Sequence, residues 1–149
     1  VPDASLHIAG DGPDLVNLKK LAAELNVPVK FHGFVSDTKK IELIHNATIF
    51  VNPSSQEGWG LTVIEVNACG VPAVAFNVHG LNDSIKNNET GFLVKDEDLD
   101  EMASRIVDLL TNNKLRERLS RNAVKWASNF SWENTVKKTN DLITKVTKR

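Results

Sequence analysis

The chain has 149 residues, 41% of them hydrophobic and 25% charged, and this ordinary balance predicts a soluble globular domain with one substantial core. No apolar run approaches the roughly 20 residues that span a bilayer, and a single cysteine, Cys69, excludes an intramolecular disulfide. The chain opens at Val1-Pro2-Asp3 without a basic, signal-like segment, so we expect a cytoplasmic protein.

Charge is unevenly distributed along the chain. From Lys114 to the C-terminus, ten Lys and Arg residues stand against Glu117, Glu133 and Asp141, which leaves +7 there and −8 in the remainder, for a net charge of −1. A solvated helical face is the simpler explanation of this asymmetry. The alternative is peripheral contact with an anionic membrane surface, at its inner face. We expect no nucleic-acid partner.

Short apolar runs alternate with stretches of helical periodicity. The runs predict strands over residues 5–9, 29–32, 48–51, 72–76 and 91–94. Helices are expected over residues 15–25, 39–46, 60–68, 82–86, 102–110 and 114–127, and from Ser131 towards Lys148. Asp14 and Ser131 are candidate N-caps, because their side-chain oxygens can accept from the first helical N–H groups. Trp126 and Trp132 are expected to be packing anchors near the C-terminus.

This alternation predicts an α/β fold with a Rossmann-like open parallel sheet and helices on both faces. Ligands bind beyond the carboxyl ends of the strands in such folds. Three loops, over residues 10–13, 33–37 and 53–60, are expected at that edge, and their convergence predicts a single ligand site.

The most informative stretch runs from Asn52 to Gly70. Its β-branched residues could form a strand, but the preceding glycine-rich loop and the Ala-Cys-Gly ending favour a helix that begins near Gly60. The free N–H groups and dipole at such a helix start attract an anion. Glu57 and Glu65 flank that start. A charge within Leu-Thr-Val-Ile-Glu-Val-Asn-Ala is costly to bury, so Glu65 must face a cleft, a salt bridge or a ligand.

Other site types are disfavoured by the sequence. Gly10-x-Gly12 is part of a dinucleotide fingerprint, but Leu15 stands in place of the third glycine and no acidic residue ends the next strand, so a plain NAD site is not expected. We find no Walker motif, no metal-ligand cluster and no Ser/His/Asp order.

The text P-S-S-Q-E-G-W-G-L-T-V-I-E-V-N-A-C-G-V-P-A-V-A resembles the E-x7-E region of retaining, GT-B-fold glycosyltransferases of family 4. Further matching pieces occur in order over residues 8–13, 29–33, 90–94 and 130–132. The resemblance therefore spans nearly the whole chain. It identifies the C-terminal, donor-binding domain, so residues 1–149 are expected to be a nucleotide-sugar-binding part of a two-domain hexosyltransferase.

The resemblance implies roles for individual residues. Glu57 would bind the donor sugar near the reacting carbon and is the catalytic candidate, and Glu65 would accept from the ribose hydroxyls. The remaining implied contacts are backbone N–H groups of Gly58, Gly60, Leu61 and Thr62 for the distal phosphate, close approach at Gly10 and Gly12, and Phe34 and Val35 for the base. No cofactor is implied and metal independence is expected, so the helix dipole and basic side chains would stabilise the leaving diphosphate.

The chain departs from the family pattern in several places. Trp59 replaces the usual Phe and is expected to reshape the sugar pocket, and His79-Gly80 stands where Gly-Gly is common. The resemblance implies that residues 1–149 begin after the family's first strand–helix unit, with its Arg and Lys, and after its N-terminal acceptor domain. Lys39 or Lys40 could supply charge in place of that Arg and Lys.

Because that first strand is central in the family's sheet, we expect an unpaired internal edge, repaired by rearrangement or by strand exchange in a homo-oligomer. We expect the isolated chain to transfer no sugar to an acceptor. Another GT-B enzyme, such as a sugar-nucleotide epimerase, and a non-catalytic binding module remain alternatives.

Overall fold

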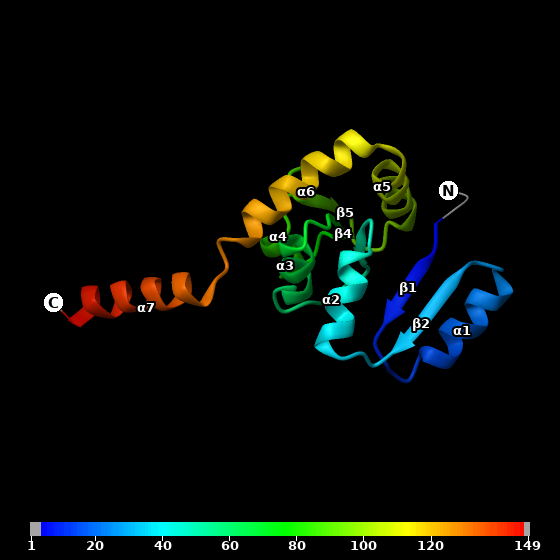
Figure 1. Cartoon of the computed structure of the whole chain (residues 1–149), viewed down its shortest axis with the longest axis horizontal. Helices are drawn as coiled ribbons and strands as arrows, with labels where there is room; N and C mark the ends of the chain where they lie inside the picture. Colours follow the sequence, from blue (N-terminus) through cyan, green and yellow to red (C-terminus); the bar gives the residue numbers. More distant parts are fainter. Residues whose placement is uncertain (1–3, 148–149) are drawn as a thin grey trace. The chain divides into compact units, whose positions relative to one another are not determined.

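Five strands, each paired in parallel within its own sheet, alternate with helices over residues 4–147, the part of the chain that the computed structural model describes (Figure 1). The predicted α/β fold class is therefore confirmed. The chain divides into two units, Val1–Asn46 and Ala47–Arg149, each described by itself below.

The first unit contains β1 (Leu6–Ala9), α1 (Leu15–Glu24), β2 (Val29–Gly33) and α2 (Asp37–His45). β1 pairs in parallel with β2, and Ile8 lies opposite Phe31. Ser36 caps α2, because its Oγ accepts from the Lys39 N–H at 3.3 Å. The expected cap of α1 is wrong in one respect. Asp14 holds the N-cap position, but its carboxylate accepts from the Asn17 side chain instead of a backbone N–H.

The second unit contains the other three strands and five helices. β3 (Phe50–Asn52), β4 (Ala73–Phe76) and β5 (Gly91–Val94) form a parallel sheet in the order β3-β4-β5. The helices are α3 (Leu61–Ala68), α4 (Leu81–Ser84), α5 (Leu99–Thr111), α6 (Asn113–Ala127) and α7 (Trp132–Thr147).

Two apolar clusters cover the two faces of this three-stranded sheet. Alternate side chains of β4 point to opposite faces, as the twofold period of a strand requires. Val74 and Phe76 pack with residues of α5 and α6, including Leu109 and Leu119. Ala73 and Ala75 pack with residues of α3 and α4, among them Val63 and Leu81. Helices therefore lie on both faces of this sheet, as predicted.

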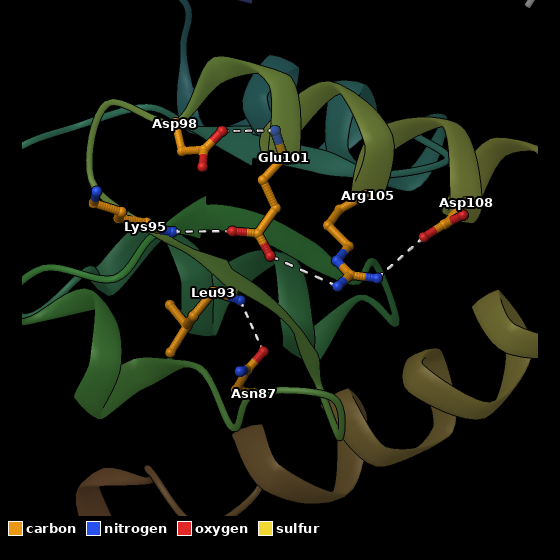
Figure 2. Close-up of polar contacts among 7 residues, drawn as sticks. All are labelled: Asn87, Leu93, Lys95, Asp98, Glu101, Arg105 and Asp108. Atoms are coloured by element: carbon orange, nitrogen blue, oxygen red, sulfur yellow. Dashed lines mark hydrogen bonds and ion pairs between the residues drawn. The ribbon is translucent and has the colours of Figure 1, made fainter.

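A chain of polar contacts fixes the start of α5 after β5 (Figure 2). Asp98 caps the helix by accepting from the Glu101 N–H at 2.9 Å. The Glu101 carboxylate accepts from the Lys95 N–H at 3.4 Å and pairs with Arg105 at 3.6 Å, and Arg105 in turn pairs with Asp108 at 3.3 Å. The acidic run that the sequence places here thus serves the helix N-terminus.

The strands form two sheets instead of one. Among the described residues, β1 is paired only with β2, and β3 only with β4. Each of these strands therefore leaves one edge without a ladder partner. The expected unpaired internal edge, and its repair by rearrangement or by a partner chain, stay predictions.

α7 differs from the other helices of the second unit because none of its residues is buried. Ser131 caps it, as predicted, by accepting from the Asn134 N–H at 3.2 Å. Trp126 is half-buried and anchors α6, but the same role predicted for Trp132 is wrong, since that side chain is 82% exposed. Lys148 lies outside the described residues. No helix within the described part of the chain is long and apolar enough to cross a membrane.

Candidate functional site

The loop between β3 and α3 is shaped at both ends by local geometry. At the last residue of β3, the Asn52 side chain accepts from the Ser54 N–H at 3.0 Å, which turns the chain away from the sheet. At the other end Gly60 adopts a left-handed conformation, with φ 76° and ψ 49°, and is the N-cap of α3. Only glycine takes this conformation without strain. The loop therefore enters α3 through a residue that carries no side chain.

The stretch after Gly60 is a helix, as predicted, despite its β-branched residues. Val63, Ile64 and Val66 are buried, and their packing outweighs their weak helix propensity. No side chain within the described residues caps the helix start, and Leu61 and Thr62 of its first turn are exposed. The N–H groups of this turn are therefore open to an anionic ligand.

The two acidic side chains differ in their exposure. Glu65 lies on the exposed face of α3, one turn beyond Leu61, and is not buried among the apolar residues around it. Glu57 is half-buried, and its carboxylate makes no hydrogen bond or ion pair with any residue between 4 and 147. Because a carboxylate that is partly withdrawn from water favours hydrogen-bond donors, Glu57 is suited to bind hydroxyl groups.

The backbone of Glu57 is held against the turn between β4 and α4. A Cβ atom added at Gly80 would lie 2.4 Å from the Glu57 carbonyl oxygen and 2.8 Å from the Gly58 carbonyl carbon. Gly80 also has a positive φ of 86°. The turn therefore approaches the loop so closely that only glycine fits. The sequence shows His79-Gly80 as a family departure but gives no sign of this contact.

Four further predicted site residues lie in the first unit. The Gly10 N–H donates to the Gly33 carbonyl at 2.8 Å, and the Gly12 N–H donates to the Asp11 carboxylate at 2.8 Å. No atom lies within 4 Å of a Cβ added at either glycine, so the backbone is approachable there. Phe34 is 89% exposed, and Val35 beside it is half-buried. An exposed aromatic ring next to open backbone fits the predicted contact with a planar base.

The structure thus gathers the predicted residues into two sets. The second unit carries six of them, on the loop and the start of α3 that follows it. They are Glu57, Gly58, Gly60, Leu61, Thr62 and Glu65. The first unit carries Gly10, Gly12, Phe34 and Val35. That the two sets form one site remains a prediction.

The two lysines suggested to replace the family's basic pair each lie close to an acidic residue of α2. Lys39 pairs with Glu42 at 2.6 Å, and Lys40 lies 3.6 Å from the Asp37 carboxylate, both within α2. Within residues 4–147 there is also no group of three or more His, Cys, Asp or Glu side chains that could hold a metal ion.

Comparison with known proteins gives the family. Residues 1–126 match the model of the family described as glycosyl transferases group 1. The chain belongs to this family. Its fold is that of the C-terminal domain of GT-B glycosyltransferases, as the sequence predicted.

Two relatives and one solved structure show the range of similarity. This group 1 domain is 39% identical over 121 residues to D-inositol 3-phosphate glycosyltransferase of Acidothermus cellulolyticus, covering 80% of this chain and 27% of that protein. It is 37% identical over 144 residues to the Mycobacterium marinum protein of the same name, covering 91% and 31%. A crystal structure of S. aureus TarM with fondaparinux, alpha-GlcNAc-glycerol and UDP has a TM-score of 0.86 and 26% identity, covering 95% of this chain and 29% of TarM. The chain thus spans less than a third of the length of these relatives.

Proposed function

We propose that this domain binds the donor of a retaining glycosyltransferase that moves a hexose from a nucleoside-diphosphate sugar to an acceptor hydroxyl. The observation that carries the proposal is the start of α3, where uncapped N–H groups lie between two acidic residues that are not sequestered in the core. The UDP present in the TarM complex supports a nucleotide of this kind.

In the proposed mode, the diphosphate rests on the N–H groups of Gly60, Leu61 and Thr62. The helix dipole favours the negative charge, and this charge grows on the diphosphate as the sugar leaves, so the same groups that bind it also stabilise the leaving group. No metal ion is needed in this arrangement.

The two carboxylates divide the hydroxyl groups of the donor between them. Glu57 binds the transferred sugar, the role that the family resemblance implies for it, and its backbone lies close to Gly80. Glu65, one turn further along α3, accepts from the two vicinal ribose hydroxyls. In the first unit, Phe34 and Val35 contact the base, and Gly10 and Gly12 allow close approach of the nucleotide.

Calorimetric titration with a panel of UDP, GDP and ADP sugars tests donor binding directly. Glu57→Gln and Glu65→Gln each remove the charge of a carboxylate but keep its size. We expect each to weaken donor binding by about 10- to 100-fold, the usual strength of a hydrogen bond to a charged group. Glu24→Gln, on the exposed end of α1, is the matched control and should change nothing. Equal affinities for all four proteins would contradict the proposal.

Product analysis separates transfer from the alternative chemistries. With donor and acceptor, we expect the whole enzyme to transfer sugar and this 149-residue chain to show no measurable transfer. An altered sugar nucleotide formed from donor alone would indicate an epimerase instead. Donor binding by a whole protein that changes neither substrate would indicate a non-catalytic binding module.

The open strand edges support a second kind of partner. We propose that the edges of β1 and β3 are completed by a strand from outside the described residues, in the whole enzyme by its own chain and in the isolated chain by a second copy. Sedimentation velocity should show an oligomer of the isolated chain. A monomer at all concentrations would contradict this proposal.

α7 supports peripheral contact of the whole enzyme with an anionic membrane at the cytoplasmic face. Its exposed apolar side chains include Trp132, Ile143 and Val146, and Lys137 and Lys145 lie among its polar residues. Co-sedimentation with anionic vesicles should be strong at low salt and weak at high salt. Equal recovery with neutral vesicles would contradict this mode of contact.

A further inference from the structure

Trp59 lies between Glu57 and the start of α3, in the loop over residues 53–60 that we call the donor loop. The sequence suggests that its bulk reshapes a sugar pocket. In the structure its ring packs edge-to-face against Phe130, with ring centroids 4.9 Å apart and an interplanar angle of 66°. This geometry is one of the two that aromatic pairs prefer. Trp59 therefore links the loop to the segment between α6 and α7, about seventy residues further along the chain.

The aromatic contact continues into the body of the second unit. Phe130 packs against Trp126 in the same edge-to-face manner, with centroids 4.9 Å apart and an angle of 82°. The Trp126 indole N–H donates to the Ser84 carbonyl at 2.8 Å, and the Lys86 ammonium lies 4.5 Å from the centroid of the Trp126 ring. Phe130 is thus held in position by Trp126, whose side chain is itself hydrogen-bonded to the backbone of Ser84.

Further contacts lead from Ser84 back to the donor loop. Ser84 is fully buried, and its Oγ donates to the Leu81 carbonyl at 3.1 Å. A Cβ atom added at Gly60, the neighbour of Trp59, would lie 2.9 Å from the same Ser84 oxygen. The path from Gly60 through Ser84, Trp126 and Phe130 back to Trp59 therefore passes through α4, α6 and the segment before α7.

We propose that Trp59 is a positioning residue for donor binding, which holds Glu57 and the start of α3 in place by anchoring the loop to Phe130. The inference rests on the proposed function for its consequence, but the anchoring itself concerns only the second unit. The loop is clamped at two points, by Gly80 against the backbone of Glu57 and Gly58 and by Phe130 against the side chain of Trp59. Loss of the second contact leaves the Trp59 end of the loop without its side-chain anchor.

Hydrogen exchange of the 149-residue chain, read by mass spectrometry in peptides over residues 55–61, tests the anchoring. Phe130→Ala removes the ring that Trp59 contacts. Trp132→Ala is the matched control, because it removes an aromatic ring two residues away that is 82% exposed. We expect exchange over residues 55–61 to rise about 2- to 10-fold in Phe130→Ala, the usual strength of an aromatic pair. It should remain unchanged in Trp132→Ala, as should exchange over β4 in both variants.

Two results would overturn the proposal. Unchanged exchange over residues 55–61 in Phe130→Ala would show that the loop is held without the aromatic contact. A rise of equal size over β4 would show that Phe130 acts on overall stability and not on the loop. Phe130→Leu, which keeps apolar volume but no ring, gives the same comparison if Phe130→Ala does not fold.

Donor titration then separates the anchoring from its functional consequence. If the wild-type chain binds a UDP sugar, we expect Phe130→Ala to weaken donor affinity by about the same factor by which it raises hydrogen exchange over residues 55–61. Trp132→Ala should leave donor affinity unchanged. Unaltered affinity with raised loop exchange would confine Trp59 to a structural role and overturn its role in donor binding. If wild-type chain binds no nucleotide sugar, the proposed function fails, while the exchange measurement still decides the anchoring.

Discussion

Replacement of Gly80 by alanine tests how the close approach between α4 and the donor loop controls Glu57. An added Cβ would lie 2.4 Å from the Glu57 carbonyl oxygen, and Cβ atoms essentially never lie within 3.0 Å of a non-bonded atom, so the oxygen must move away by about 0.6 Å. The positive φ of Gly80 adds strain for any residue with a side chain. Together these effects should lower the free energy of unfolding by about 1–3 kcal/mol.

The displacement should also impair function. Because a misplacement of about 1 Å can cost 100-fold in rate, we expect Gly80→Ala to lower kcat/KM of the whole enzyme by about 10- to 100-fold. Gly58→Ala is the matched control for stability. It lies in the same loop, but no atom lies within 4 Å of its added Cβ and its φ is not positive. Its stability should be unchanged or raised by about 0.4–1 kcal/mol.

Urea unfolding followed by tryptophan fluorescence measures the stability effect. Trp59, Trp126 and Trp132 are the three tryptophans of the chain, and all belong to the second unit, so the signal reports the unit that contains Gly80. A Gly80→Ala protein with the wild-type midpoint of urea unfolding and the wild-type donor affinity would refute this prediction. It would show that the loop accommodates the added Cβ without loss of stability or binding.

Three further predictions concern the same unit. Asn67 is fully buried, and neither polar atom of its side chain has a hydrogen-bond partner within the described residues, so Asn67→Leu should raise the free energy of unfolding by about 1–3 kcal/mol in the same urea assay. An unchanged or lower value would show that the amide is satisfied. Asp98→Ala removes the acceptor of the Glu101 N–H and should lower stability by about 1 kcal/mol, whereas Asp98→Asn should restore most of it. Hydrogen bonds from its own backbone N–H and from the Ser131 hydroxyl hold the pKa of the Glu133 carboxyl below its ordinary value. The ionised form is thus favoured in the folded state, so the first turn of α7 should lose helical NMR shifts as the pH falls through this lowered pKa, and less so in Glu133→Gln.

The sequence determined the elements and the identity of the family. Alternating apolar runs and helical periodicity predicted five strands and the helices between them, because these periods depend only on local backbone geometry. The E-x7-E stretch named Glu57 and Glu65, and the glycine before the apolar run predicted a helix start at Gly60. Boundaries shifted by a few residues, as at α5, which begins at Leu99 and not at Met102. Asp14 and Trp132 were misassigned because a cap and a packing anchor require partners that a local pattern does not specify.

Only the tertiary structure decided how the donor loop is held. The contacts of Gly80 with Glu57, of Gly60 with Ser84 and of Trp59 with Phe130 join residues twenty to seventy positions apart. Such contacts leave no period in the sequence, since they depend on where the strands and helices place the chain in space. The buried amide of Asn67 is a similar case, because its burial follows from the packing of α3 and not from its polar neighbours. Residue types in the sequence therefore predicted the chemistry of the candidate site, whereas the contacts that hold its loop in place could be found only in the structure.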